Sequence, residues 1–341
     1  MSATRSLTPT TPRYARPTET VRIALAGCGT VGGALLDLIA RHGGSIERRA
    51  GLRFEVVTIL VRDRDVPPSL HVPRERLTDS VEEFLAVPAD IVVEAIGGVT
   101  TAATIARATL ARGQRLVTAN KALLRVEGPA LAALAHGHSS LGAAIDFEAA
   151  VGGGVPVVRA LRESLTGHGV SRIRGVLNGT TNYILSRVED GDDEATALRA
   201  AQRAGFAEAD PSRDLSGLDA ADKIAVLAWL AFGVDPTRLL VRTLGLPPDL
   251  AAAVRNARAK GRVLRLVAEV EEREGVVCAS VAPVLLEAND PLARARDEEN
   301  VVVIESESAG AITLHGRGAG GLATASALLA DLLRASSPVL A

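Results

Sequence analysis

The sequence is poor in aromatic residues and in cysteine. Aromatic residues make up 2% of the 341 residues, although apolar residues together reach 47%, so the core must be built from aliphatic side chains. An aliphatic core suits a parallel sheet that is covered by helices on both faces. Two cysteines, Cys28 and Cys278, cannot form a disulfide framework, and their spacing is not that of a usual metal site. A reducing compartment fits these absences, and we expect a cytoplasmic protein.

An excess of one charge and long apolar runs are also lacking. The 38 basic and 40 acidic residues give a formal net charge of −2, so no overall field favours nucleic acid or anionic lipid. No window holds eighteen uninterrupted apolar residues, which argues against a membrane span. Residues 1–20 lack the apolar run of a secretory signal and are expected to be a flexible tail. We therefore expect neither a nucleic-acid nor a membrane partner.

What the sequence does contain is an alternation of short apolar runs and amphipathic segments from Val21 to about Phe147. This alternation is typical of βαβ units and a parallel sheet. The chain also exceeds the length at which a single core usually stops growing, so two or more domains are expected. The predicted strands span residues 21–26, 54–61, 90–96, 115–120 and 141–147. The predicted helices span 31–42, ended by Gly43 and Gly44, then 101–112 and 129–136.

A glycine-rich turn at residues 151–156 marks a change of character. The later elements are predicted as a helix at 157–165, a strand at 171–177, three helices up to Phe232, strands at 263–269 and 276–282, and a strand–turn–strand–loop–helix over 301–333.

The expected fold class is α/β, with a Rossmann-type doubly wound parallel sheet plus an α+β substrate and dimerisation domain. The expected divisions are a tail (1–20), a dinucleotide-binding domain (21–150), a substrate, catalytic and dimerisation domain (151–300), and a C-terminal segment that returns to the first domain (301–341).

The motif GCGTVG, which begins at Gly27, matches the dinucleotide-binding pattern G-x-G-x-x-G. It follows a predicted strand directly and opens a predicted helix, which is the context that the motif requires. Gly27 permits the tight turn, Gly29 lets the backbone approach a pyrophosphate, and Gly32 lets the helix pack on the strand. The helix N-terminus, with Thr30 and Val31, then faces the phosphates. The alternative is a glycine-rich turn without a ligand, which this context disfavours.

The end of the second predicted strand bears on the choice of cofactor. A dinucleotide site that prefers NAD usually presents Asp or Glu here, whereas the first polar residue in this sequence is Arg62, followed by Asp63. An arginine favours the 2′-phosphate of NADP(H), with NAD(H) as the other candidate. The alternative is a solvated loop charge paired with Asp63.

The richest polar stretch is AGFAEADPSRDLSGLDAADKIAVLAWLAFG, residues 204–233. It surrounds one lysine, Lys223, with five carboxylates: Glu208, Asp210, Asp214, Asp219 and Asp222. On a helix that begins near Leu218, Asp219 and Lys223 are i and i+4 and share a face. The same face carries an apolar stripe, so burial should lower the pKa of Lys223 while Asp219 should raise it. A lysine in this position is a candidate proton donor and acceptor for an alcohol that loses hydride to nicotinamide.

Two interpretations of this stretch remain open on spacing alone. The pair of Asp219 and Lys223 fits an ordinary ion pair on a solvated helix face as well as it fits an acid/base site. The carboxylates outnumber the cations that can pair with them, which suits a substrate ammonium group or a solvated acidic loop.

Several longer motifs resemble the homoserine dehydrogenase family, in the order that the family has them. They are GCGTVG, VVEAIGG, VTANKALL, FEAAVGGGVPVV, LNGTTNYIL, GFAEADPSRDLSGLDAADKIAVLA and GRGAGGLATASALLADLL. The likeness covers nearly the whole chain after the tail. It implies a nicotinamide-dependent oxidoreductase that interconverts L-homoserine and L-aspartate 4-semialdehyde in threonine, methionine and isoleucine biosynthesis. It also implies a homodimer, and the second sheet is the expected interface.

The resemblance also implies roles for the polar residues. The lysine that matches Lys223 is the proposed acid/base, and the aspartate that matches Asp219 assists it. Glu208 and Asp214 would hold the ammonium group of the amino acid. Lys121, in the NKALL segment, would lie by the nicotinamide and the substrate, where it could polarise the carbonyl. Without the resemblance, a surface lysine that caps strand and helix would be the default interpretation of Lys121.

Family members carry a monovalent cation, usually sodium, bound mostly through backbone carbonyls. By position, the implied ligands are Glu148, Val151, Gly153 and Val155. The alternative is a glycine-rich hinge between domains.

Substrate and cofactor contacts are implied elsewhere in the chain. The segment from Asn178 to Thr181, with Gly179 and Thr180 between them, lies at a predicted helix start and suits the substrate carboxylate; plain N-capping explains it equally well. The further cofactor contacts carried over are Gly97, Gly205 and Gly320.

The sequence departs from the family pattern in its C-terminal half. The usual proline of the GPGAG loop is Arg317 here, and we expect a short form without the amino-acid-binding regulatory domain that many members add. A rival semialdehyde dehydrogenase would need a nucleophilic cysteine beside a base, and neither Cys28 nor Cys278 fits. The other rivals are a non-catalytic NAD(P)-binding sensor and a related oxidoreductase acting on another small amino-acid-like substrate.

Overall fold

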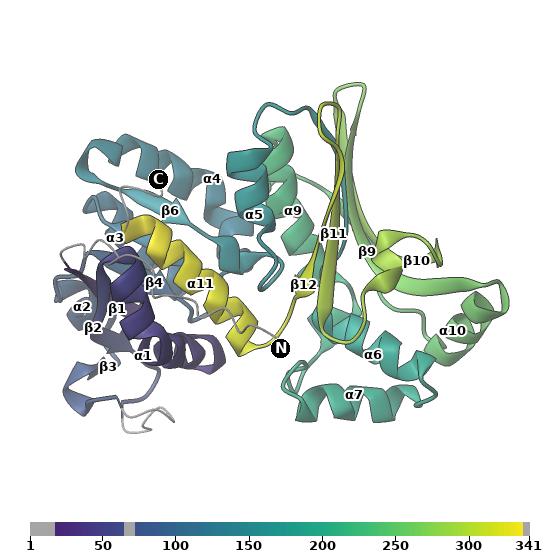
Figure 1. The fold of residues 1–341 in the computed structure, drawn as a ribbon, viewed down its shortest axis with the longest axis horizontal. Coiled ribbons are helices and arrows are strands. Elements are labelled where there is room, and N and C mark those ends of the chain that lie inside the picture. Colours follow the sequence, from purple (N-terminus) through teal and green to yellow (C-terminus); the bar gives the residue numbers. More distant parts are fainter. Residues whose placement is uncertain (1–17, 65–71, 337–341) are drawn as a thin grey trace, which may run out of the picture.

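The computed structural model describes residues 18–64 and 72–336, and most of the expected tail lies outside them. The chain forms two six-stranded sheets with helices around each of them (Figure 1). The predicted α/β class, with a doubly wound parallel sheet and a second, mixed sheet, is confirmed. No helix in the described part of the chain is long and apolar enough to cross a membrane.

The first sheet is fully parallel and has the strand order β3-β2-β1-β4-β5-β6. This is the order of the Rossmann fold, in which β2 and β3 lie on one side of β1 and β4 to β6 lie on the other, so that the strand order switches between β1 and β4. Its strands are β1 (Glu19–Ala26), β2 (Leu52–Leu60), β3 (Leu77–Thr78), β4 (Ile91–Glu94), β5 (Arg115–Thr118) and β6 (Ala144–Asp146). Its helices are α1 (Thr30–Ala50), α2 (Val81–Ala86), α3 (Thr100–Ala111) and α4 (Lys121–Gly137).

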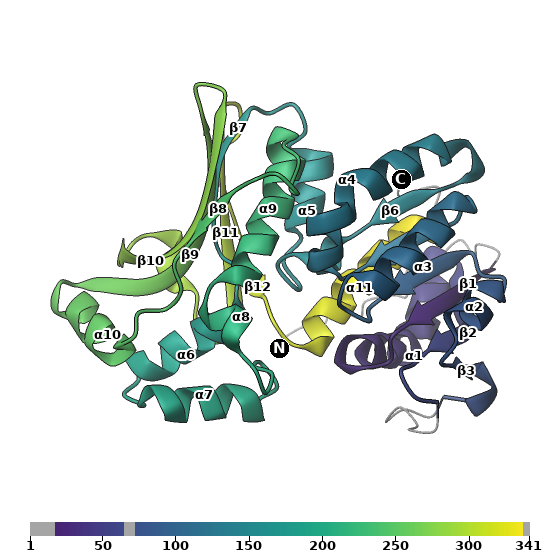
Figure 2. The same ribbon diagram turned by 180° about the vertical axis from the view of Figure 1, so that it is seen from behind.

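Both faces of this sheet are covered, as its uninterrupted apolar strands predict. In β1, Ile23 and Leu25 belong to one apolar cluster, whereas Ala24 and Ala26 belong to the other. Helix α1 and the last helix, α11 (Gly321–Ser336), cover the first face, and α3 and α4 cover the second (Figures 1 and 2). The alternation of side chains along a strand therefore places the strand in two cores at once.

Two predicted helix boundaries were wrong. Helix α1 continues through Gly43 and Gly44 to Ala50, and Gly51 ends it in the left-handed conformation with φ 69°. A glycine inside a helix costs about 1 kcal/mol relative to alanine, and the burial of Ile46 in the last turns outweighs that cost. Helix α4 begins at Lys121 rather than near residue 129, because the Asn120 side chain accepts the Leu123 N–H and caps it.

The second sheet has the order β12-β11-β7-β9-β10-β8 and is antiparallel except where β8 pairs with β10. Its strands are β7 (Val170–Val176), β8 (Val241–Thr243), β9 (Arg262–Arg273), β10 (Val276–Glu287), β11 (Glu299–Ser306) and β12 (Gly310–Arg317). The helices around it are α5 (Val157–Arg159) with the π-helical η4 (Ala160–Ser164), α6 (Gly179–Glu189), α7 (Glu194–Arg203), α8 (Ser212–Leu215), α9 (Leu218–Phe232) and α10 (Leu250–Ala259). The sequence did not predict β3, β8, α2 or α10, since short strands and short helices carry little periodicity.

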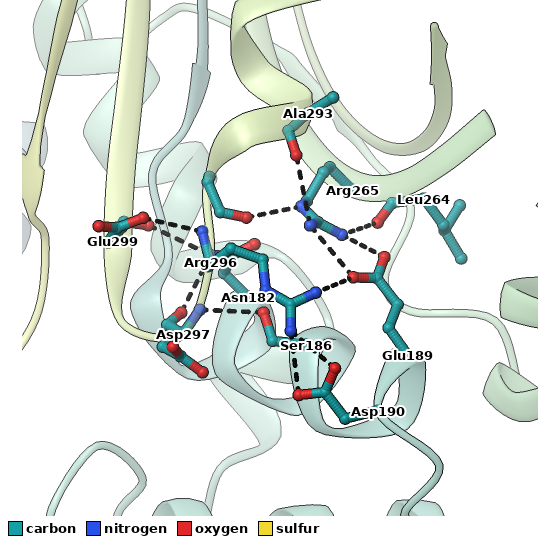
Figure 3. Close-up of polar contacts among 11 residues, drawn as sticks. Asn182, Ser186, Glu189, Asp190, Leu264, Arg265, Ala293, Arg296, Asp297 and Glu299 are labelled. Atoms are coloured by element: carbon teal, nitrogen blue, oxygen red, sulfur yellow. Dashed lines mark hydrogen bonds and ion pairs between the residues drawn. The ribbon is translucent and has the colours of Figure 1, made fainter. Parts of the chain in front are cut away.

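A buried arginine ties α6 to the second sheet. The Arg265 side chain on β9 is 1% exposed, and its guanidinium pairs with Glu189 at the end of α6 at 2.5 Å. Arg296 extends this network to Glu189 and Asp190, and Asn182 donates to the carbonyls of Asp297 and Glu299 (Figure 3). A charge so deeply buried is tolerated only when it is fully paired, so α6 is held in one orientation on the sheet.

The two sheet units meet through α4 and α9, which lie side by side (Figure 2). The Trp229 ring on α9 stacks on Phe147 with the ring centroids 5.9 Å apart, and Gly128 on α4 is the position that the indole approaches. A single apolar cluster runs from β1 and β4 of the first unit to α9 and β11 of the second. Packing between α4 and α9 therefore decides how the polar ends of these two helices face each other.

Candidate active site

A cleft of about 1010 Å³ opens at the carboxyl ends of β1, β2 and β4. This edge is the topological switch point, where open parallel sheets bind nucleotides. Of the predicted cofactor contacts, Gly27, Gly29, Arg62 and Gly97 line the cleft. The structure places the others outside its described lining: Thr30, Val31, Gly32, Lys121, Gly205 and Gly320.

The three glycines of the first turn differ in whether a side chain would fit at their positions. A Cβ on Gly32 would lie 1.9 Å from the Gly27 carbonyl oxygen, and one on Gly27 would lie 2.6 Å from the Ala95 oxygen. A Cβ on Gly29 would have no heavy atom of the described chain, apart from its immediate neighbours, within 4 Å. Gly27 and Gly32 thus allow close packing, and Gly29 leaves open space beside the first turn of α1. Gly29 supplies no side-chain cap, so the first N–H groups of α1 remain available to an anion.

The second feature is one carboxylate that holds two lysines. Asp219 Oδ2 lies 2.7 Å from the Nζ atom of Lys223, and Asp219 Oδ1 lies 2.9 Å from the Nζ atom of Lys121. Lys223 Nζ also donates to the Leu177 carbonyl oxygen at 2.7 Å. The side chains of Lys223 and Asp219 are 12% and 10% exposed, so this is no solvated surface pair. The predicted i, i+4 pair on α9 is confirmed, and α4 adds the second lysine.

The charges of this cluster support one another. Burial by itself would raise the pKa of the Asp219 carboxyl, but the ammonium groups of Lys223 and Lys121 outweigh it and hold that pKa well below its usual range. Burial would lower the pKa of Lys121, yet Asp219 outweighs it and raises that pKa. The Asp219 carboxylate is therefore ionised near neutral pH, with a cation on each of its oxygens.

Asn178 connects the two carboxylates of the cluster. Its Nδ2 atom donates to Asp214 Oδ1 at 2.7 Å and to Asp219 Oδ2 at 2.8 Å. Its Oδ1 atom accepts the Thr181 N–H at 2.8 Å, which confirms the predicted N-cap of α6. Burial first, and the Asp219 charge second, raise the pKa of the Asp214 carboxyl. Sequence reasoning identified Asn178 as a cap or a substrate contact and missed this bridge, because the bridge joins residues 36 and 41 positions apart.

In the described chain, Glu208, Asp210 and Asp222 form no ion pair with either lysine, although the Asp222 charge helps to raise the pKa of Lys121. The Glu208 side chain is exposed, and its backbone carbonyl accepts a hydrogen bond from Gln202. Asp222 pairs with Arg213 at 2.7 Å, and Asp210 accepts the Ser212 N–H. After Asp219, Asp214 is the carboxylate that a hydrogen bond joins to the cluster, through Asn178.

The C-terminal glycine loop packs against the start of α6. A Cβ on Gly179 would lie 2.5 Å from the Ala319 Cβ, and one on Gly321 would lie 2.6 Å from the Thr30 carbonyl oxygen. Thr180 Oγ1 donates to the Phe206 carbonyl at 2.5 Å. The loop between β12 and α11 therefore lies between α6 and the N-terminus of α1. Because the loop packs so closely on both sides, only glycine fits at positions 179 and 321.

The segment predicted to bind a cation is buried and tightly folded. The Glu148 carboxylate accepts the N–H groups of Val158 and Arg159 at 2.9 and 2.8 Å. The carbonyl oxygens of Val151 and Gly153 accept no hydrogen bond from any residue in the described ranges 18–64 and 72–336. Within those ranges, no group of three or more His, Cys, Asp or Glu side chains is arranged to hold a metal ion. Backbone oxygens, rather than side chains, are the ligands that this segment offers to a cation.

Two buried polar residues behind the cleft wall were not singled out by sequence reasoning. Glu94 ends β4 and is fully buried, and Asn120 precedes α4 and is 7% exposed. The signal for Glu94 was present in the run IVVE, where a charged residue closes an entirely apolar strand. Its significance depends on partners more than twenty positions away along the chain.

Comparison with known proteins places these features in a family. The family model for the homoserine dehydrogenase NAD-binding domain matches residues 27–143, and the homoserine dehydrogenase model matches residues 156–333. The chain belongs to the homoserine dehydrogenase family. Homoserine dehydrogenase from Synechocystis is 38% identical over 92% of this chain and 73% of its own length. The enzyme from Mycobacterium tuberculosis is 40% identical over 93% of this chain and 72% of its own length.

Solved structures agree with this family. A homoserine dehydrogenase from Thiobacillus denitrificans superposes with a TM-score of 0.85 at 35% identity, covering 94% of this chain and 74% of that one. A putative homoserine dehydrogenase from Archaeoglobus fulgidus gives 0.79 at 30% identity, covering 93% of this chain and 99% of that one. This homoserine dehydrogenase is therefore an NAD(P)-dependent oxidoreductase with a small-molecule substrate. The alternative of a non-catalytic sensor is not favoured.

Proposed function

We propose that this homoserine dehydrogenase interconverts L-homoserine and L-aspartate 4-semialdehyde with Lys223 as the acid/base. The observation that carries the proposal is the buried Asp219 carboxylate between two lysine ammonium groups. The nicotinamide cofactor supplies or accepts the hydride. During reduction, the Lys223 ammonium donates its proton to the aldehyde oxygen, and during oxidation the neutral amine takes the proton of the alcohol.

The neighbouring residues have supporting parts in this proposal. Asp219 orients the Lys223 ammonium, and the Lys121 ammonium stabilises negative charge on the substrate oxygen. Asp214 lies beside the same cluster and, with Glu208, is proposed to bind the ammonium group of the amino acid. Gly179 and Thr180 at the N-terminus of α6 are proposed to bind its carboxylate, since that helix end favours an anion.

The test is turnover of L-homoserine by the purified chain, followed by the absorbance of reduced nicotinamide. Wild type is expected to turn over with NADP or NAD. Replacing Lys223 by Ala should lower kcat by about 10²- to 10⁴-fold, the range typical of a lost general acid/base. Cofactor affinity should be unchanged, because the Lys223 side chain lies outside the cleft lining. Full activity of Lys223→Ala would exclude the acid/base assignment.

For the cofactor we propose a preference for NADP(H) over NAD(H). Arg62 lines the cleft at the end of β2, where the 2′-phosphate of a bound NADP would lie. A hyperthermophilic archaeal homoserine dehydrogenase mutant, 28% identical to this chain, has been solved in complex with NADPH. The check is the ratio of NADP to NAD affinity in wild type and Arg62→Ala. An unchanged ratio would remove the assignment.

We propose a sodium site formed by Glu148, Val151, Gly153 and Val155. Hard cations bind oxygen ligands, and the carbonyl oxygens of Val151 and Gly153, to which no residue of the described ranges donates, support this donor set. Such an ion would hold the turn between the two sheet units. Activity measured with sodium replaced by a large organic cation tests the site, and identical rates in both salts would count against it.

We also propose a division of the chain and an assembly. Residues 21–150 would hold the cofactor and 151–300 the substrate, with 301–341 returning to the first unit, which the packing of α11 on α1 supports.

For the assembly, we propose a cytoplasmic homodimer that forms through the second sheet. Its proposed role is in threonine, methionine and isoleucine biosynthesis. The exposed Leu240 and Leu244 beside the edge strand β8 support that interface, and light scattering on the purified chain tests it.

A further inference from the structure

Glu94 is a fully buried carboxylate to which the proposed mechanism gives no role. Its Oε2 atom accepts the hydroxyl of Thr118, and its Oε1 atom accepts the N–H groups of Ile96 and Gly97 and the amide of Asn120. A carboxylate is almost never fully buried unless it is paired, and no side-chain cation of the described residues pairs with this one. Four donors on β5 and on the loops that follow β4 and β5 take the place of a cation.

One set of these bonds shapes the wall of the cofactor cleft. Ile96 and Gly97 both line the cleft, and the Glu94 carboxylate holds their N–H groups at 3.0 and 3.3 Å. The same turn lies against the glycine motif, since the Ala95 N–H donates to the Ala26 carbonyl at 2.8 Å. The position of Glu94 therefore determines where the turn of residues 95–98 meets a bound cofactor.

The other set leads to the catalytic lysine on α4. Asn120 Nδ2 donates to Glu94 at 3.3 Å and to the Gly98 carbonyl at 2.6 Å, while its Oδ1 atom caps α4 at the Leu123 N–H. Lys121 is the first residue of that helix and reaches Asp219. The same amide thus joins the cleft wall to the end of the helix that carries Lys121.

We propose that Glu94 is a positioning residue that couples the cleft wall to Lys121. It keeps Lys121, beside the substrate, at a constant distance and orientation from the wall that receives the nicotinamide. The inference rests on the proposed role of Lys121. Glu94 acts through Asn120 and does not contact the reacting atoms.

The experiment is a double-mutant cycle on kcat with Glu94→Gln and Lys121→Ala. Glutamine keeps the shape of the side chain, but its amide nitrogen cannot accept the Thr118 hydroxyl. Its neutral oxygen also binds the donors of Ile96, Gly97 and Asn120 more weakly than a carboxylate does. If Glu94 acts through Lys121, Glu94→Gln lowers kcat by about tenfold in wild type and by less than about twofold in Lys121→Ala. Equal factors in both backgrounds, or no effect in wild type, overturn the proposal.

The cycle also separates this inference from the proposed role of Lys121. The ratio of wild type to Lys121→Ala tests that role alone, and the non-additive part tests Glu94. If Glu94→Gln does not fold, Thr118→Val replaces it, because this change keeps the shape of the side chain and removes the hydroxyl that donates to Glu94 and accepts the Asn120 N–H. The same non-additivity is then expected, with a smaller factor, and its absence overturns the proposal.

A matched control changes a partly buried carboxylate on α6, away from the cleft lining. Glu189 is 18% exposed and pairs with Arg265 behind the second sheet (Figure 3). Glu189→Gln should lower the melting temperature while changing kcat by the same small factor in wild type and in Lys121→Ala. If the control shows the same non-additivity as Glu94→Gln, the coupling is a general effect of destabilisation and the proposal fails.

Discussion

At Asp219, one carboxylate faces two ammonium groups and one amide, all within 2.9 Å. Each of its oxygens carries a cation, and Asn178 adds a neutral donor to the oxygen that Lys223 uses. Such an arrangement restricts the rotation of the carboxylate, because turning it would break two charge-assisted bonds at once. The orientation of Lys223 therefore depends on the partners of Asp219 as much as on the helix.

The Asn178 bridge can be removed without a change in net charge. In Asn178→Ala, Asp214 and Asp219 lose their shared donor, and α6 loses its cap. We expect a fall in unfolding free energy of about 0.5–2 kcal/mol from the cap and a fall in kcat from the loosened Asp219. Asn178→Ser, which can still cap, should recover the stability but not the activity. Recovery of both by serine would show that capping is the only role of Asn178.

The lowered pKa of Asp219 predicts a pH dependence of stability. A carboxyl whose folded pKa lies below its unfolded value stabilises the fold above the unfolded value, about 3.9, and loses that contribution as pH falls. The free energy of unfolding of wild type should therefore exceed that of Asp219→Asn at pH 7, and the difference should shrink as pH falls below about 4. Urea unfolding at several pH values measures it, and a constant difference would contradict the prediction.

At the scale of elements, the contact between α4 and α9 sets the distance between Lys121 and Asp219. A Cβ on Gly128 would lie 2.9 Å from Trp229 Cζ3, which is closer than such atoms pack. The indole itself stacks on Phe147 with the ring centroids 5.9 Å apart. The two helices can approach closely enough for the lysine to reach the carboxylate only because residue 128 has no side chain.

Adding one methyl group at this contact should move α4. We expect Gly128→Ala to lower kcat and the melting temperature, since overpacking typically costs about 1–3 kcal/mol. The matched control is Gly137→Ala on the same helix, where the added Cβ would meet nothing within 4 Å in the described chain beyond its own neighbours and helix backbone. The control should leave kcat unchanged. Equal effects of the two substitutions on kcat would show that helix packing does not position Lys121.

In the molecule as a whole, the last helix of the described chain packs against the first helix. The match to the NAD-binding family model ends at residue 143. Nevertheless, Ala325, Leu328 and Leu332 of α11 belong to the apolar cluster that contains Ile23 and Leu25 of β1. Its Asp331 accepts the Glu148 N–H at 2.8 Å, which joins α11 to the segment between the two units. The core beside the first sheet is therefore built from two stretches of chain that the second sheet separates.

This arrangement predicts that a core substitution near residue 328 destabilises the unit that binds the cofactor. Leu328→Ala should lower the unfolding free energy by about 2–5 kcal/mol through the cavity that it leaves and should weaken NADPH binding. Leu322→Ala on the same helix removes a side chain that is 51% exposed, and surface changes stay within about 0.5 kcal/mol. Denaturant unfolding and NADPH fluorescence compare the two, and equal losses would contradict the prediction.

Much of the fold is predictable from sequence because its signals are local. Buried parallel strands read as unbroken apolar runs, and GCGTVG occupies the strand-to-helix turn that the motif needs. The errors also have local causes. Periodicity predicts that α1 ends at Gly43 and Gly44 and that α4 begins near residue 129, because it shows neither the packing of Ile46 nor the cap of Asn120. The doubly wound class and the pair of Asp219 and Lys223 were predicted correctly.

Local patterns in the sequence are enough to predict the doubly wound sheet, the glycine turn, the helix that presents Asp219 and Lys223 on one face, and, through longer motifs, the family. The packing of distant elements brings Lys121 to Asp219, places Asn178 between two carboxylates and puts Glu94 behind the cleft wall. Hydrophobic periodicity records which face of an element is buried. It carries no information on which distant side chain meets that face, because such contacts arise only when separate elements pack.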